Sequence, residues 1–71
     1  MRRIEVERRR CGLSIAALAR AAVMNPATVG QIESGYIGRP YASQLVRLAE
    51  ALAWPAERSA ELLDEVTVNE R

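Results

Sequence analysis

The chain has 71 residues, of which 49% are apolar and 27% are charged, and its formal net charge is +1. This length allows one small domain. No apolar run approaches the roughly 20 residues of a membrane-spanning helix, so neither a membrane span nor a secretory signal is expected. A single Cys and the lack of His exclude a disulfide framework within the chain, a Cys/His metal cluster and Ser/His catalysis.

Charge is distributed unevenly along the chain. Residues 1–50 carry eight Arg and four Glu, a net charge of +4, whereas residues 51–71 carry two Arg and five acidic residues, a net charge of −3. This asymmetry suits a domain that touches a polyanion with one face, although an ordinary charged surface gives the same balance. One Trp, two Tyr and no Phe are too few for the stacking platforms of RNA-binding proteins.

The first predicted helix covers residues 2–11, a stretch rich in Arg and Glu that ends before Gly12. Ile4 and Cys11 are seven residues apart, so they share one helical face, which we expect to point into the core. Cys11 is accordingly predicted to be a small core residue.

The second predicted helix begins after Ser14, whose hydroxyl is placed to accept a hydrogen bond from a free backbone N–H of the first turn. Its apolar stripe consists of Leu18, Ala19 and Ala22. The first and second helices are therefore separated only by a short segment around Gly12.

The third predicted helix begins after Asn25, a second capping residue, with Pro26 at the first helical position. Proline is favoured there because its missing N–H would have no helical partner. Val29 and Ile32 are expected to face inward, and Gly35 is expected to end the helix.

A fourth helix is predicted from about Tyr41 to Ala53, with an apolar face at helical spacing made of Leu45, Leu48, Ala49 and Leu52. After Pro55 we expect a fifth short helix, which carries Leu62, Leu63 and Val66. Trp54 is interpreted as a lid over the last two helices or as an interface anchor. These elements predict an all-α fold, a compact five-helix domain.

The second and third helices are about eight residues each and are joined by residues 22–24, which is the spacing of a helix-turn-helix. In such a motif the first helix lies across the DNA backbone and the second enters the major groove. Gln31 is the best candidate for reading a base, because an amide can form hydrogen bonds with both N6 and N7 of adenine. The alternative is a solvent-facing helix residue that contacts no base.

A set of residues resembles the Cro/C1-type (Xre-like) helix-turn-helix family, which includes the lambdoid phage repressors and has the lambda repressor-like DNA-binding fold. They are Gly12-Leu13-Ser14, Leu18-Ala19, Ala22, Thr28-Val29, Gln31-Ile32-Glu33-Ser34-Gly35, Arg39-Pro40 and Leu48-Ala49-Glu50-Ala51-Leu52. The resemblance runs from Ile4 to about Ala56. It implies five helices and a sequence-specific DNA-binding transcription regulator that works as a dimer.

The resemblance also implies roles for particular residues. Arg8 and Glu33 are expected to form a buried ion pair between the first helix and the end of the third. The expected DNA-binding residues contact the backbone or the base edges; they are Ser14, Pro26, Ala27, Thr28, Gln31, Ser34, Arg39 and Tyr41. Tyr41 is expected either to pack at the start of the fourth helix or to donate its hydroxyl to a phosphate.

Two positions depart from the family pattern. Ile15 stands where the family usually has Gln, and Val23 stands where the turn usually carries Gly. If the turn requires a positive φ, a β-branched residue there is strained. These departures keep a second interpretation open, a protein-interaction module such as an antitoxin or anti-activator.

The sequence thus predicts a helix-turn-helix DNA-binding domain over residues 1–56 and a C-terminal helix and tail over residues 57–71. We expect a small phage or bacterial repressor that binds a double-stranded DNA operator as a homodimer in the cytoplasm, associated with the nucleoid. No catalytic role, cofactor, metal, membrane or small-molecule ligand is expected.

The C-terminal segment is the predicted dimerisation region. Leu62, Leu63 and Val66 offer more apolar surface than a lone end helix can bury, and Val66-Thr67-Val68 favours an extended strand. The alternative is that these leucines cap the core of their own domain.

Overall fold

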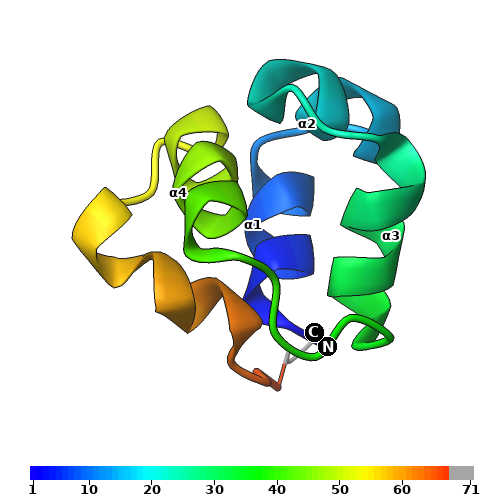
Figure 1. The fold of residues 1–71 in the computed structure, drawn as a ribbon. Helices are drawn as coiled ribbons and strands as arrows, with labels where there is room; N and C mark the ends of the chain where they lie inside the picture. The colour runs from blue at the N-terminus through cyan, green and yellow to red at the C-terminus, as the bar shows by residue number, and fades with distance from the viewer. Residues whose placement is uncertain (68–71) are drawn as a thin grey trace.

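The computed structural model describes residues 1–67 of the chain. Four α-helices are followed by one 3₁₀ helix, and they are α1 (Arg3–Arg10), α2 (Ile15–Ala22), α3 (Pro26–Ser34), α4 (Ala42–Ala51) and η1 (Ala56–Leu63). Over the described residues, β pairing is limited to one isolated bridge between Arg2 and Glu65. The predicted all-α fold with five helices is confirmed (Figure 1).

Both central helices begin, and α3 also ends, as their local sequence predicts. Ser14 Oγ accepts a hydrogen bond from the backbone N–H of Ala17 at 3.0 Å, and Asn25 Oδ1 accepts one from Ala27 at 2.8 Å. Pro26 occupies the start of α3, and Gly35 ends this helix with a φ of 88°. The starts of both helices are therefore fixed by side chains that accept from a free backbone N–H, and the end of α3 is fixed by a glycine in the left-handed conformation.

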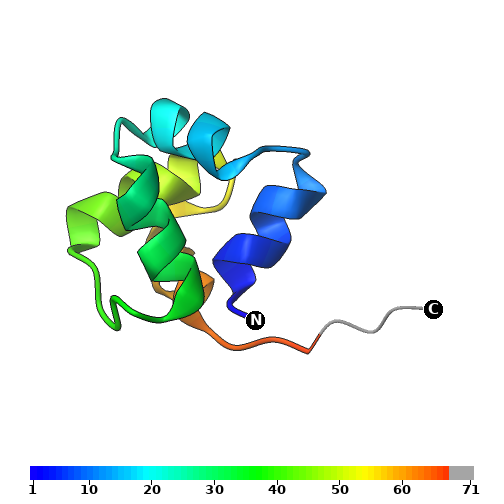
Figure 2. The ribbon, with the colours of Figure 1, turned by 90° about the vertical axis from the view of Figure 1, so that its right-hand side faces the viewer.

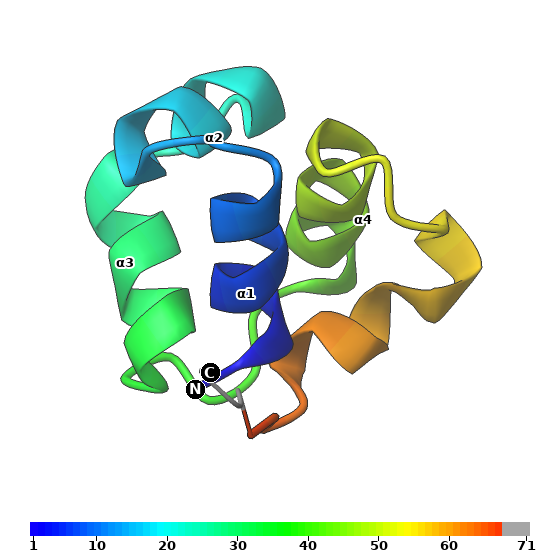
Figure 3. The ribbon, with the colours of Figure 1, turned by 180° about the vertical axis from the view of Figure 1, so that it is seen from behind.

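The core is formed by one face of each helix. Helix α2 contacts both α3 and α4, and η1 contacts both α4 and α1, so α1 closes the side of the molecule that faces the viewer in Figure 3. The buried apolar residues are Ile4, Leu18, Ala19, Ala22, Val29, Ile32, Leu45, Leu48, Ala49, Leu52 and Leu62. The inward faces predicted for the second, third and fourth helices are confirmed in full.

The turn between α2 and α3 keeps its left-handed geometry although a valine occupies it. Val23 has φ 57° and ψ 54° and is 77% exposed. The backbone N–H of Met24 donates to the carbonyl of Ala19 at 2.8 Å, which closes the end of α2. A left-handed conformation costs a residue with a Cβ roughly 1–2 kcal/mol, so the turn is held by packing on both sides rather than by local preference.

The fifth helix is 3₁₀ rather than α-helical. The indole N–H of Trp54 donates to the carbonyl of Arg58 at 3.0 Å, and Arg58 has φ −114° and ψ 19°. An α-helix would use this carbonyl for its own i+4 hydrogen bond, so the indole contact competes with α-helical bonding. Trp54 is half-buried and packs against the core, and the Cζ atoms of Arg3 and Arg58 lie 5.7 Å and 5.4 Å from the centroid of its ring.

The prediction that Cys11 is a core residue is wrong. Helix α1 ends at Arg10, and Cys11 is exposed as the residue that follows it. The helical face that Cys11 shares with Ile4 is apolar at Ile4, but the next residue on this face is Arg8, which pairs with Glu33. The apolar face therefore does not extend as far as Cys11. The Cys11 thiol lies at the rim, 3.9 Å from the carbonyl oxygen of Leu52.

The C-terminal segment folds back onto the N-terminus. Leu62 is fully buried, the N–H of Arg3 donates to the carbonyl of Asp64 at 2.8 Å, and that of Val66 donates to the carbonyl of Met1 at 2.8 Å. Leu62 therefore fills the core of its own domain, while Val68 of the predicted strand lies outside the described residues. Among the residues described, no helix has the length and apolar character needed to cross a membrane.

Candidate nucleic-acid interface

Helix α3 presents one uncovered face. Successive residues of an α-helix are turned by about 100°, so positions 26, 27, 30, 31 and 34 share one side of α3. Four of these, Pro26, Ala27, Gln31 and Ser34, are exposed, and Gly30 between them is partly exposed. On the view from this side no described helix lies in front of α3 (Figure 2).

The opposite side of α3 is buried, which fixes the orientation of the exposed face. Val29 and Ile32 have no exposed surface, and Glu33 is only 7% exposed. Thr28 is half-buried at the boundary between the two sides. The structure thus brings Pro26, Ala27 and Gln31 together on one surface, with Thr28 at its edge.

Arg8 and Glu33 join the first and third helices. The Nε and Nη2 atoms of Arg8 donate to the two carboxylate oxygens of Glu33 at 2.6 Å and 3.1 Å, and Nη1 donates to the carbonyl of Leu13 at 2.9 Å. The side chains are only 12% and 5% exposed. Hydrogen bonding to Glu33 raises the pKa of Arg8, against the opposing effect of burial. This bidentate pair fixes the C-terminal end of α3 relative to α1.

Arg2 holds the loop that follows α3, and sequence reasoning missed it. Its guanidinium donates to the carbonyls of Ile32 and Ile37 at 3.1 Å and 3.3 Å, and to that of Gly38 at 3.3 Å. At Ile32 the contact adds to the hydrogen bond from the Gly35 N–H, and at Ile37 and Gly38 it satisfies carbonyls of the loop. No sequence signal marks Arg2, because its partners are backbone groups about 30 residues away that only the fold brings near.

The loop itself carries several exposed polar and aromatic side chains. Ser34 Oγ donates to the carbonyl of Gln31 at 3.2 Å and accepts from the N–H of Tyr36 at 3.3 Å. Tyr36 and Tyr41 are 81% and 79% exposed, and Arg39 is also exposed. Tyr36 is absent from the predicted contacts, although an aromatic residue directly after the glycine that ends α3 is a signal that could have identified it.

Tyr41 lies at the start of α4, where the side chain of Gln44 accepts a hydrogen bond from its backbone N–H at 3.0 Å. Tyr41 is 79% exposed, so it does not pack at the start of α4, and its contact with a phosphate stays a prediction.

The N-terminus of α2 forms a separate part of the surface. Ser14 is exposed, and its hydroxyl oxygen is occupied by the cap to Ala17. Ile15, which replaces the usual polar residue, is half-buried and packs against the core. The departure at Ile15 thus removes one polar group from this surface and adds an apolar contact inside the domain.

The fold and the two capped helices agree with the comparison to known families. A model of the helix-turn-helix domain family matches residues 2–62, and the chain belongs to this family. The family assignment indicates a DNA-binding regulator. Comparison with curated proteins and with solved structures gave no match.

Proposed function

We propose that the protein is a sequence-specific DNA-binding transcription regulator that inserts α3 into the major groove. The observation that carries this proposal is the uncovered face of α3, with Pro26, Ala27 and Gln31 exposed, on a helix whose other side is buried. A rigidly held helix with one free face is the element that fits a groove about 12 Å wide.

Within this proposal the residues divide into two roles. Gln31 reads a base edge through its amide, and Ala27 packs against a thymine methyl beside Pro26. Ser14, Thr28, Ser34, Arg39 and Tyr41 contact the sugar-phosphate backbone and set the orientation of the domain. Because small residues dominate the face of α3, much of the specificity comes from DNA shape.

We further propose that the protein acts as a repressor and as a homodimer, of the Cro/C1 type. One copy offers a single long polar side chain, Gln31, among the α3 positions predicted to contact bases, so one half-site gives little discrimination. Two copies related by a two-fold axis would read half-sites about 34 Å apart on a palindromic operator. Val66, which is half-buried in the single chain, is the C-terminal apolar residue offered to a partner.

Selection from a random duplex pool tests the proposal. We expect enrichment of a site with two-fold symmetry and a complex of two chains per duplex, measured by sedimentation. Binding should weaken steeply with salt, because each phosphate contact releases counterions. A final pool indistinguishable from the starting pool would contradict sequence-specific binding, and one chain per duplex would contradict the dimer.

A second candidate is a protein-interaction module that keeps the fold without DNA binding, as in an antitoxin or anti-activator. Ile15 and Val23 favour it, because one removes a polar group from the start of α2 and the other places an exposed apolar side chain in the turn. Titration with a random duplex at two salt concentrations separates the candidates, because an adaptor of this kind binds no duplex at either.

A further inference from the structure

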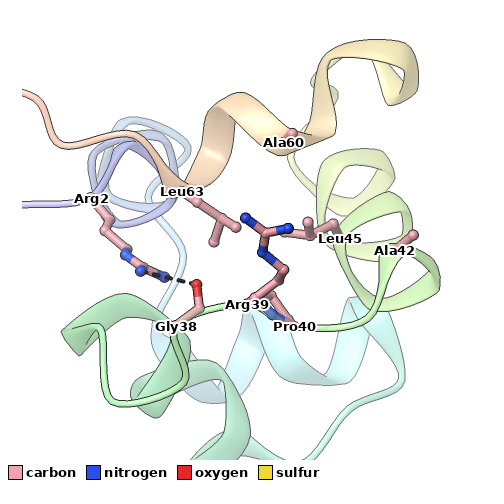
Figure 4. A pocket seen from close by; sticks show the side chains of 8 residues that line it. All are labelled: Arg2, Gly38, Arg39, Pro40, Ala42, Leu45, Ala60 and Leu63. Atoms are coloured by element: carbon pink, nitrogen blue, oxygen red, sulfur yellow. Dashed lines mark hydrogen bonds between the residues drawn. The ribbon is translucent and has the colours of Figure 1, made fainter.

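A pocket lies beside the loop between α3 and α4, and none of the residues that line it belongs to α3. It is bounded by the start of α1, the loop at Gly38 and Arg39, the first part of α4 and the second half of η1 (Figure 4). Its volume is about 600 Å³. Small-molecule sites in proteins have volumes of about 300–1,000 Å³, so this pocket is large enough for a ligand of modest size.

Apart from Gly38 and two arginines, the residues that line the pocket are aliphatic. Leu45 of α4 faces Leu63 and Ala60 of η1, and none of the described residues that line the pocket is acidic or aromatic. A cationic ligand would therefore meet no carboxylate there, and a sugar would meet almost no hydrogen-bond acceptor. A hydrocarbon chain is the group that these walls accommodate.

Two arginines lie at the pocket, and they are not equivalent. The guanidinium of Arg2 is already engaged by the backbone carbonyls of Ile32, Ile37 and Gly38. Arg39 forms no hydrogen bond or ion pair with another residue in the range 1–67, and its guanidinium lies between Leu45 and Leu63 (Figure 4). The pocket therefore combines aliphatic walls with one cation that has no described partner.

We propose that this pocket binds a medium-length aliphatic carboxylate. The carboxylate pairs with the planar guanidinium of Arg39, which matches it with two parallel hydrogen bonds. The aliphatic chain lies against Leu45, Ala60 and Leu63.

Occupancy of the pocket would also regulate DNA binding, a consequence that rests on the proposed function. Arg39 is the proposed phosphate contact of the α3–α4 loop, and a carboxylate bound to its guanidinium in the pocket would neutralise its charge and hold it away from the phosphate. The bound carboxylate should therefore act on DNA affinity as the loss of Arg39 does. The slope of log affinity against log salt should fall by about one unit.

Direct binding of octanoate to the protein without DNA tests the site, measured by calorimetry and by amide shifts in NMR. We expect saturable binding with a dissociation constant on the order of 1 mM, at residues around Arg39, Leu45 and Leu63. Acetate and octan-1-ol, which lack the chain or the charge, should bind at least about tenfold more weakly. No saturation by roughly 10 mM octanoate, or equal binding of octan-1-ol, would overturn the proposal.

Two matched variants show where the ligand sits. Ala60→Phe fills the pocket from η1 and should abolish octanoate binding, whereas Ala56→Phe places the same ring on η1 outside the pocket lining and should leave it unchanged. Arg39→Gln should also abolish binding. Equal octanoate affinity in Ala60→Phe and the parent would contradict the assignment, provided that both give the dispersed spectrum of a folded chain.

The effect of octanoate on DNA binding is measured separately. If octanoate binds and lowers the salt slope on duplex DNA, both proposals stand. If octanoate binds in the pocket but no duplex binding exists, the ligand site stands and the proposed function fails. If octanoate binds and duplex affinity and its salt slope are unchanged, the regulatory consequence is wrong.

Discussion

At the scale of single residues, Val23 shows how the fold overrides a local preference. The residue sits in the left-handed region at φ 57°, where a β-branched side chain is disfavoured, and its side chain is 77% exposed. It therefore gains little from packing that would offset the strain.

We expect Val23→Gly to stabilise the domain by about 1 kcal/mol, because the release of strain exceeds the added flexibility of the unfolded chain. Chemical unfolding measures the free energy of unfolding. Ala21→Gly is the matched control, since Ala21 is exposed and helical and lies two residues before Val23. This variant should destabilise the domain by about 0.5–1 kcal/mol. Equal destabilisation by both variants would show that the turn is not strained.

The Arg8–Glu33 pair is the most consequential contact between charged side chains. Glu33→Ala would leave the guanidinium of Arg8 largely buried without its carboxylate, and we expect a loss of about 3–5 kcal/mol in the free energy of unfolding. A 71-residue domain has a total stability of only about 4–10 kcal/mol, so this loss unfolds a sizeable fraction of it.

Glu5→Ala is the control for this prediction. Glu5 pairs with Arg9 at 2.6 Å, but the Arg9 side chain is 61% exposed, and such pairs contribute at most about 1 kcal/mol. Thermal melts of the two variants should differ clearly. A similar midpoint for both would mean that the Arg8–Glu33 pair contributes no more than a surface contact.

Arg39 is the arginine of the α3–α4 loop that is proposed to contact a phosphate. Arg39→Ala should weaken binding by a similar factor on selected and random duplexes, and should lower the salt slope by about one unit. Arg47, an exposed arginine of α4, provides the control, and Arg47→Ala should leave the slope closer to that of the parent. An unchanged salt slope in Arg39→Ala would show that Arg39 contacts no phosphate.

At the scale of elements, the helices could be predicted where their signals are local. Ser14, Asn25 with Pro26, and Gly35 define the limits of α2 and α3 within the sequence itself. The 3₁₀ form of η1 could not be predicted, because it is accompanied by the indole of Trp54 bonded to the carbonyl of Arg58. The position of Cys11 depends equally on how far α1 extends past the core.

The loop between α3 and α4 depends on a contact that no sequence pattern shows. Arg2→Ala removes three hydrogen bonds to the carbonyls of Ile32, Ile37 and Gly38. We expect a loss of about 1–3 kcal/mol and faster amide exchange at Ile37, whose N–H donates to the carbonyl of Gln31 at 3.1 Å.

Hydrogen exchange followed by NMR measures the effect of Arg2 on the loop. Arg10→Ala is the control, because Arg10 is exposed and contacts only Glu7 among the described ion pairs. Exchange at Ile37 that is equally slow in the Arg2 variant and in the parent would show that the loop is held by other contacts.

At the scale of the whole molecule, the candidate interface was only partly accessible from the sequence. Exposure of Pro26, Ala27 and Gln31 on one side of α3 follows from helical periodicity and the buried positions of Val29 and Ile32. The pocket at Arg39 could not be predicted, since residues near 2, 39, 45 and 63 meet only in the fold. The C-terminal segment, predicted to serve a dimer, contributes Leu62 to the core of its own chain.

The proposed reading of bases by the exposed face of α3 is tested by Gln31→Ala. Affinity is measured for the duplex obtained by selection and for a random duplex at the same salt concentration. We expect Gln31→Ala to weaken binding to the selected duplex by about 1–3 kcal/mol and to relax the preference at one base pair in each half-site. Its binding to the random duplex should stay near that of the parent. Equal losses on both duplexes, or no loss on either, would contradict base reading by α3.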